Sequence, residues 1–282
     1  MKTPQIATTI ADAQAAVQHA RQSGKRIGFV PTMGALHEGH MSLVHASQES
    51  CDYNAVSIFV NPTQFGEGED LNRYPRTFDA DLGKLTDRGV DLVLAPTSDQ
   101  MYPSGYSTFV EPPEVASRLE GTCRPVHFRG VATVVLKLFN AVPADIAFFG
   151  EKDFQQCLVI QHMVRDLNLR TKVVPCPIIR ELDGLAMSSR NRYLSADDRS
   201  RALSLAKALE SAANEFERGN RDAAAIETRM LDCLQADSVD YAVVVNADTL
   251  GPFVEHIIDA PAVALIAAHV GSTRLIDNRR LN

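Results

Sequence analysis

Short apolar runs alternate with helical patterns through the first two-thirds of this 282-residue chain, and this alternation limits the fold more than any other feature. The strand-length runs cover residues 26–30, 54–60, 91–95, 145–149 and 171–174. Helical patterns cover residues 37–50, 78–88, 130–141 and 153–168. Near-continuous apolar strands separated by helices predict an α/β fold, in which helices cover both faces of a parallel sheet.

The pattern changes between about Pro177 and Asp183. The segment Ser195 to Asp198 resembles a capping box, and the apolar residues that follow recur at helical spacing. A second helical pattern, 222–234, precedes strand-like runs at 241–245, 263–267 and 273–276. Helices followed by strands predict a smaller α+β domain. We therefore expect a nucleotide-binding catalytic domain over residues 1–180 and a C-terminal domain over residues 181–282 that closes over the active site.

Composition restricts the partners. The formal net charge is −7, which argues against a broad basic surface for nucleic acid but leaves room for a local cationic pocket. The five cysteines are odd in number and form no CxxC pair, so a disulfide framework and a Cys-rich zinc site both fit poorly. The first residues contain no apolar signal core, and no run approaches the ~20 apolar residues that span a bilayer. We expect a cytoplasmic chain that binds no membrane.

The segment 31–40, PTMGALHEGH, joins the first of these strands to the next helix. In an open α/β sheet, ligands bind at the carboxyl ends of the strands, and a helix start attracts phosphate. Gly34 permits close backbone approach, and His37 and His40 share one face of a helical turn. As donors, the two histidines suit charge that develops on phosphate oxygens. The alternatives are a metal pair, although HExxH spacing is absent, or two ordinary surface histidines.

Three further motifs follow strands or lie at the domain boundary. Asn61 and Gln64 offer amides to a hydroxyl or a carboxylate. The segment 150–156, GEKDFQQ, places Lys152 as a phosphate-binding charge with Gln156 one helical turn beyond it. The segment 187–191, MSSRN, brings two hydroxyls and a guanidinium, which fit a triphosphate. Each motif taken alone could be a polar turn or a capped helix start, but together they suit one nucleotide.

Familiar signatures of other enzymes are absent from the sequence. It contains no GxxxxGK[ST] loop, and no GxGxxG follows the first of these strands. No Ser-His-Asp or Cys-His pattern indicates a covalent acyl-enzyme. His127 and Arg129 either line the cleft or simply precede the buried helix, with about even weight for each reading.

These motifs, in this order, resemble the pantoate–β-alanine ligase (pantothenate synthetase) family from about Ile27 to Leu194. The resemblance implies a Rossmann-like nucleotidyltransferase domain and a homodimer. It also implies condensation of (R)-pantoate with β-alanine through a pantoyl-adenylate, with ATP and Mg²⁺ required and with pantothenate, AMP and diphosphate as products. Pantothenate is a coenzyme A precursor, so the chain would belong to that pathway.

The resemblance also implies roles for single residues. Gln64 would hold pantoate and lie near β-alanine, and Gln156 would hold pantoate; we add Asn61 as a substrate-binding residue. His40 would be the proton donor, and His37, Lys152 and Arg190 complete the predicted catalytic set. The ATP-binding residues would be Met33, Gly34, Ala35, Leu36, His37, Glu38, Gly39, His40, Gly150, Glu151, Lys152, Asp153, Ile179 through its backbone, Met187, Ser188, Ser189 and Arg190.

The metal ligands stay unassigned. Asp79 and Asp81 could help to hold magnesium, but we expect them to be helix-surface carboxylates. Rival functions are an adenylyltransferase that moves AMP onto a phosphorylated acceptor, a non-catalytic nucleotide-binding or sensor module, and a class I aminoacyl-tRNA synthetase. The acidic balance and the lack of room for a tRNA-binding domain disfavour the synthetase.

Overall fold

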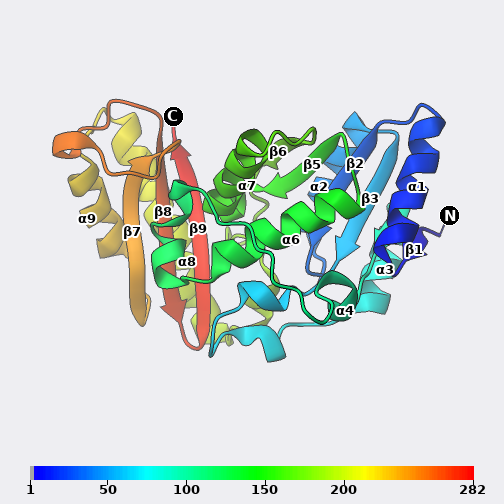
Figure 1. Cartoon of the computed structure of the whole chain (residues 1–282). Coiled ribbons are helices and arrows are strands. Elements are labelled where there is room, and N and C mark those ends of the chain that lie inside the picture. The colour runs from blue at the N-terminus through cyan, green and yellow to red at the C-terminus, as the bar shows by residue number, and fades with distance from the viewer. Residues whose placement is uncertain (1–2) are drawn as a thin grey trace. The chain divides into compact units, whose positions relative to one another are not determined.

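The computed structural model describes residues 3–282, which divide into two compact units (Figure 1). The first unit runs up to Glu151 and resumes over Gln156–Pro177. The second unit contains Ile178–Asn282 together with the short segment Lys152–Gln155. The assignment of residues 181–282 as a domain that closes over the active site stays a prediction.

A parallel sheet organises the first unit. Within residues 3–282 it has six strands in the order β1-β4-β3-β2-β5-β6, and every pairing is parallel. The predicted α/β class and all five predicted strands are confirmed. A short edge strand precedes them. The sequence analysis did not predict this strand, because it has only three residues and buries one of them. The strands are β1 (Gln5–Ala7), β2 (Ile27–Thr32), β3 (Tyr53–Ile58), β4 (Leu92–Leu94), β5 (Ile146–Gly150) and β6 (Lys172–Cys176).

Helices cover both faces of this sheet, as predicted (Figure 1). Val30 of β2 packs in one apolar cluster with residues of α2 and α3. Its neighbour Phe29 points to the opposite face, where its ring meets Phe139 of α6 edge-on at 6.4 Å. The predicted helices are α2 (Glu38–Ser50), α3 (Phe78–Asp87), α6 (His127–Ala141) and α7 (Phe154–Asp166). The sequence analysis did not predict α1 (Ile10–Gln22), α4 (Ser98–Met101) or α5 (Glu120–Cys123).

The strand order locates the most favourable place for a ligand. The chain passes outward from β2 through β3 to β4, whereas β5 and β6 lie on the other side of β2. The order therefore reverses between β2 and β5, and ligands of such sheets bind beyond the carboxyl ends at that point. The segment 31–40 leaves the end of β2, and Gly150 ends β5. Two of the predicted motifs thus follow the strands that flank the reversal.

The second unit is α+β, as predicted. Its sheet is antiparallel in the order β7 (Ser238–Asn246), β8 (Ala262–Val270) and β9 (Thr273–Leu281). The helices α8 (Ala196–Glu217) and α9 (Ala223–Cys233) share an apolar core with this sheet. Ser195 caps α8 by accepting a hydrogen bond from the Asp198 amide at 3.1 Å, which confirms the predicted capping residue.

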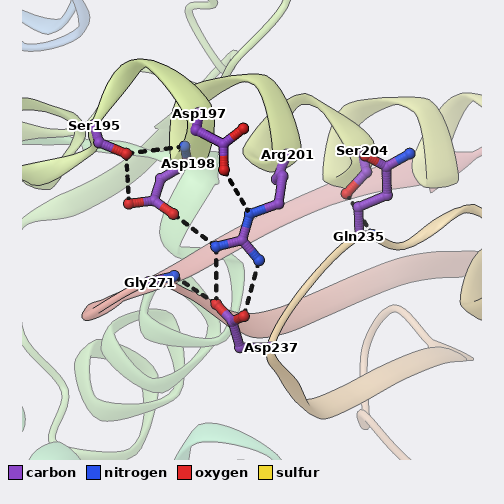
Figure 2. Close-up of polar contacts among 8 residues, drawn as sticks. All are labelled: Ser195, Asp197, Asp198, Arg201, Ser204, Gln235, Asp237 and Gly271. Carbon is purple, nitrogen blue, oxygen red and sulfur yellow. Dashed lines mark hydrogen bonds and ion pairs between the residues drawn. The ribbon is translucent and has the colours of Figure 1, made fainter.

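An ion-pair cluster ties the start of α8 to the neighbourhood of the β8–β9 turn (Figure 2). Arg201 of α8 contacts Asp198 at 2.6 Å and Asp237 at 2.8 Å. Asp237 also accepts a hydrogen bond from the Gly271 amide at 2.6 Å.

In the described part of the chain, no helix has both the length and the apolar character required to cross a membrane.

Candidate active site

The loop after β2 has a fixed and unusual backbone. Gly34 has φ of 84° and Ala35 has φ of 51°, so two consecutive residues lie in the left-handed region. A Cβ on Gly34 would lie 3.1 Å from Ile58 and 3.2 Å from Asp81, so glycine also fits the space. The Thr32 hydroxyl accepts a hydrogen bond from the Gly34 amide at 3.1 Å and donates to the Ser57 carbonyl at 2.6 Å. Neighbouring strand β3 therefore helps to hold the loop.

His37 and His40 face each other at the start of α2. His37 is the N-cap residue, and its Nδ1 accepts a hydrogen bond from the Gly39 amide at 3.2 Å. His40 Nδ1 accepts one from the His37 amide at 3.3 Å, and the ring centroids lie 4.1 Å apart. Since Nδ1 accepts in both rings, each neutral imidazole carries its proton on Nε2. The capping interaction thus makes both histidines donors through Nε2.

Gln64 belongs to a buried amide network. Asn61, 1% exposed, donates through Nδ2 to Gln64 Oε1 at 3.0 Å and to the Gly130 carbonyl at 3.2 Å. Tyr102 donates through its hydroxyl to Asn61 Oδ1 at 2.7 Å, which fixes the orientation of that amide. Gln64 Nε2 faces the Met33 sulfur at 3.3 Å. A thioether is a weak acceptor, so a carboxylate or hydroxyl oxygen would be a better partner for this donor.

The first turn of helix α6 holds the backbone of Gln64. His127, the first residue of α6, donates through Nδ1 to the Gln64 carbonyl at 3.1 Å. Burial, reinforced by the charge of Arg124, lowers the pKa of His127 to about 4, so the ring is neutral. Gly130 comes so close that a Cβ there would lie 2.3 Å from the Thr63 carbonyl oxygen. His127, for which the sequence left two readings open, therefore positions the 3₁₀ turn Pro62–Gln64 together with Gly130.

Arg129 has a different environment from His127. Its guanidinium lies 4.0 Å from the ring centroid of Phe109, and its Nε lies 3.8 Å from a Glu111 oxygen. Half of its side chain is exposed. The described contacts thus place Arg129 on Phe109 rather than on Gln64.

The segment 150–156 is shared between the two units. In the first unit, a Cβ on Gly150 would meet no atom within 4 Å, so neither packing nor φ demands glycine there. In the second unit, the Lys152 carbonyl accepts a hydrogen bond from Asn278 of β9 at 2.9 Å. Lys152 Nζ lies 3.9 Å from Asp153, and the Lys152 side chain is largely buried. Asn278 was missed from the sequence, because its partner Lys152 lies 126 residues earlier in the chain.

The segment 187–190 follows a small hairpin of the second unit. Arg180 and Ala186 form a β-bridge, and the Met187 amide donates to the Ile179 carbonyl at 2.9 Å. The Ser188 hydroxyl accepts from the Arg190 amide at 3.3 Å and caps the 3₁₀ helix Ser189–Tyr193. This bond is the capped-turn arrangement that the sequence left open, and it does not test binding of a triphosphate.

Asp277 anchors this hairpin to β9. It is 4% exposed and pairs with both terminal nitrogens of Arg180, at 2.7 and 3.0 Å. A bidentate pair of this kind fixes the guanidinium plane. Sequence reasoning missed Asp277 as well, because its partner Arg180 lies 97 residues earlier in the chain.

One prediction about the carboxylates of α3 is wrong. Asp79 is exposed, as expected, but Asp81 is buried and 1% exposed. Asp81 accepts hydrogen bonds from the amides of Ala35 and Leu36, at 2.9 and 2.8 Å. Helical spacing did not show this, because the partners of Asp81 lie on a different element 46 and 45 residues earlier in the chain.

The predicted site residues are divided between the two units. The first unit brings Met33, Asn61 and Gln64 into contact and holds His37 against His40. It also contains Gly150, Glu151 and Gln156, whereas Lys152, Asp153, Ile179, Met187, Ser188, Ser189 and Arg190 belong to the second unit. Within residues 3–282, no three His, Cys, Asp or Glu side chains gather in a way that could hold a metal ion.

Comparisons with known proteins agree with one family. Residues 5–280 match the sequence model of the Pantoate-beta-alanine ligase family. A pantothenate synthetase of Rhodopirellula baltica is 57% identical over 278 residues, covering 97% of this chain and 98% of that protein. Pantothenate synthetase 1 of Bradyrhizobium diazoefficiens is 51% identical over 276 residues, covering 97% and 96%.

Solved structures show the same similarity. Pantothenate synthetase from Thermus thermophilus superposes with a TM-score of 0.92 at 41% identity, covering 98% of this chain and 99% of that one. A pantoate-beta-alanine ligase from Francisella tularensis, complexed with beta-gamma ATP and beta-alanine, superposes with a TM-score of 0.76 at 32% identity, covering 98% and 97%.

Proposed function

The chain belongs to the pantoate–beta-alanine ligase family, and from this premise we propose how its residues carry out the ATP-dependent condensation of pantoate with β-alanine. The observation that carries the proposal is the orientation of His37 and His40. Both rings accept backbone hydrogen bonds through Nδ1, so both offer Nε2–H as a donor. Donors that are fixed before the reaction stabilise charge that develops on phosphate oxygens.

The first step is attack of the pantoate carboxylate on the α-phosphorus of ATP, with departure of diphosphate. The Nε2–H groups of His37 and His40 donate hydrogen bonds to the phosphoryl oxygens and the bridging oxygen as negative charge builds there. His40 fills the proton-donor role that the resemblance implies through this Nε2–H, whose proton is shared with the phosphate oxygen and stays on the ring. Gln64 holds pantoate, because its Nε2 faces the Met33 thioether and gains a stronger acceptor when a pantoate oxygen arrives. Asn61 keeps the Gln64 amide in the required orientation.

The second step is attack of the β-alanine amine on the carbonyl of the pantoyl-adenylate, with departure of AMP. The route forms and breaks bonds only among the substrates, so it needs no nucleophile from the chain. Gln156 is proposed as a further pantoate ligand, with Gln64 also near β-alanine. The nucleotide ligands proposed for the first unit are Met33, Gly34, Ala35, Leu36, His37, Glu38, Gly39, His40, Gly150 and Glu151.

For the second unit, we propose that Lys152 and Arg190 bind phosphate oxygens and that Asp153, Ile179, Met187, Ser188 and Ser189 contribute to nucleotide binding. The bond from Asn278 to the Lys152 carbonyl supports this role, because it fixes the backbone from which the Lys152 side chain extends. A fixed backbone lowers the entropy lost when a flexible lysine binds an anion.

Mg²⁺ and a homodimer are also proposed on the basis of the family resemblance, and a cytoplasmic location on the basis of the sequence pattern. Mg²⁺ commonly keeps several waters and binds substrate phosphates through few protein carboxylates. The described acidic side chains form no three-membered cluster, and Asp81 already accepts two backbone amides. Mg²⁺ would therefore bind through the phosphates of ATP and neutralise part of their charge.

The test of the proposed function starts with release of AMP and diphosphate. ATP and Mg²⁺ are supplied with pantoate and β-alanine, added singly and together. Steady release only with both substrates, together with a new amide product, is expected. ATP binding without turnover would favour the sensor module, and transfer of AMP to a phosphorylated acceptor would favour the adenylyltransferase.

Two variants of His40 separate the effect of its Nδ1 capping hydrogen bond from the effect of its Nε2–H donor. Asparagine places an oxygen where Nδ1 accepts from the His37 amide, but it has no group at the Nε2 position. We expect His40→Asn to keep its Tm and to lose about 10²–10³-fold in kcat. Glutamine reaches the Nε2 position with an N–H donor, so His40→Gln should retain more activity than His40→Asn. A near-normal kcat for His40→Asn would contradict the role of His40.

A further inference from the structure

The carboxylate of Asp81 lies inside the backbone turn that precedes the two histidines. It accepts hydrogen bonds from the Ala35 amide through Oδ2 at 2.9 Å and from the Leu36 amide through Oδ1 at 2.8 Å. The Thr77 hydroxyl donates to Oδ2 at 3.1 Å. Asp81 is 1% exposed, so its charge is removed from bulk water and satisfied by these three donors.

The turn has the geometry of an anion-binding site. Successive backbone N–H groups in a tight turn form a concavity that attracts a negative group. Here Gly34 and Ala35 both have positive φ, and the amides of Ala35 and Leu36 point at the same carboxylate. Lys84, one turn beyond Asp81, donates to the Leu36 carbonyl. Helix α3 thus holds both the amide and the carbonyl of Leu36, directly before His37.

This arrangement limits which backbone donors of the loop can bind a phosphate oxygen. A phosphate oxygen cannot use the Ala35 and Leu36 amides while Asp81 accepts from them, so the contacts proposed above between these two residues and ATP use other atoms. A buried carboxylate at this point would also repel a phosphate that approached the turn. The anionic ligand is therefore directed to the start of α2, where His37 and His40 donate.

We propose that Asp81 is a positioning residue for the ligase reaction: its carboxylate fills the anion-binding turn at Ala35 and Leu36 and so sets the position of His37 and His40. The proposal rests on the proposed function of these histidines. It gives Asp81 no contact with the substrates and no metal ion, and it makes the turn a support for the site rather than a phosphate cradle.

The test replaces Asp81 with asparagine, which has nearly the same shape. The new amide offers one oxygen acceptor, and its N–H₂ group faces a backbone donor. We expect kcat to fall about 10–100-fold, because a small misplacement of catalytic groups is costly. The Mg²⁺ concentration for half-maximal activity should not change. Hydrogen exchange in a peptide covering residues 33–41 should become faster, while a peptide from β8 and β9 keeps its rate.

Asp79→Asn is the matched control, because Asp79 is exposed on the same first turn of α3. It should leave kcat, the Mg²⁺ dependence and the exchange rates unchanged. If Asp81→Asn does not fold, Thr77→Val removes a single bond to the same carboxylate and should produce a smaller change in kcat and exchange in the same direction.

Three results would overturn the proposal. A raised Mg²⁺ requirement with unchanged exchange at residues 33–41 would make Asp81 a metal ligand. Faster exchange with unchanged kcat would make the bond purely structural, and slower exchange would contradict the geometry. His40→Asn and the unmodified chain are measured alongside. No AMP release from the unmodified chain with both substrates would refute the proposed function, and full activity of His40→Asn would refute the donor role of His40. An inactive His40→Asn beside a fully active Asp81→Asn overturns only the role of Asp81.

Discussion

Replacing His127 with asparagine should make the stability of the first unit less sensitive to pH below neutrality. His127 is 8% exposed and stays neutral in the fold, because burial and the nearby Arg124 lower its pKa to about 4. In the unfolded chain the ring titrates near its ordinary value of 6.5. Between these values the unfolded state binds more protons than the folded state, so stability falls as the pH falls.

The size of the effect follows from the two pKa values. They lie about 2.5 pH units apart, and each unit corresponds to about 1.4 kcal/mol. The contribution of His127 is therefore complete above about pH 6.5, falls by about 2 kcal/mol at pH 5, and has fallen by about 3 kcal/mol below pH 4. The neighbouring Glu69 carboxylate does not reverse this sign. Burial alone would raise the pKa of Glu69, but the hydrogen bond and charge of Arg124 hold it below its usual value, so Glu69 stays charged.

The assay is urea unfolding at pH 7.5 and pH 5, with hydrogen exchange of α6 peptides to report on the first unit. Asparagine can still donate to the Gln64 carbonyl, so His127→Asn should keep most of the stability at pH 7.5. The loss between the two pH values should be about 2 kcal/mol smaller than in the unmodified chain. His45→Asn, on an exposed position of α2, controls for loss of a histidine. Equal pH dependence in His127→Asn and the unmodified chain would refute the reasoning.

Other substitutions test packing and charge. Gly130→Ala should destabilise the first unit by about 3 kcal/mol or more and lower kcat/KM, because the new methyl would overlap the Thr63 backbone, whereas Gly83→Ala, which meets no atom within 4 Å, should be neutral or stabilising in thermal unfolding. Equal Tm values for the two would contradict this. Arg201→Met should lower the Tm of the second unit by breaking its pair with Asp237 (Figure 2), and the loss should shrink in 1 M salt. A salt-independent loss would assign the effect to packing.

Local sequence signals predicted the long strands and helices better than they predicted the edge strand or the residues that hold the site in place. The strands of the parallel sheet were found because each is a continuous apolar run of the right length. Strand β1 and helix α1 were missed: β1 has only three residues, and α1 has an apolar stripe composed mostly of alanine. The N-caps Ser195 and His37 lie where the pattern placed the helix starts, since a cap and its amide partner are two or three residues apart.

The sequence by itself determined the α/β and α+β classes, the order of the elements, the family and the candidate site motifs, because periodicity, caps and motifs are properties of neighbouring residues. Only the tertiary structure decided that Asp81 serves the loop and that Asn278 holds the backbone of Lys152. Those bonds depend on direction and on groups brought together by folding: Asn278 and Lys152 are 126 residues apart. Hydrogen bonds over such separations leave no local pattern, so they emerge only when the chain is folded.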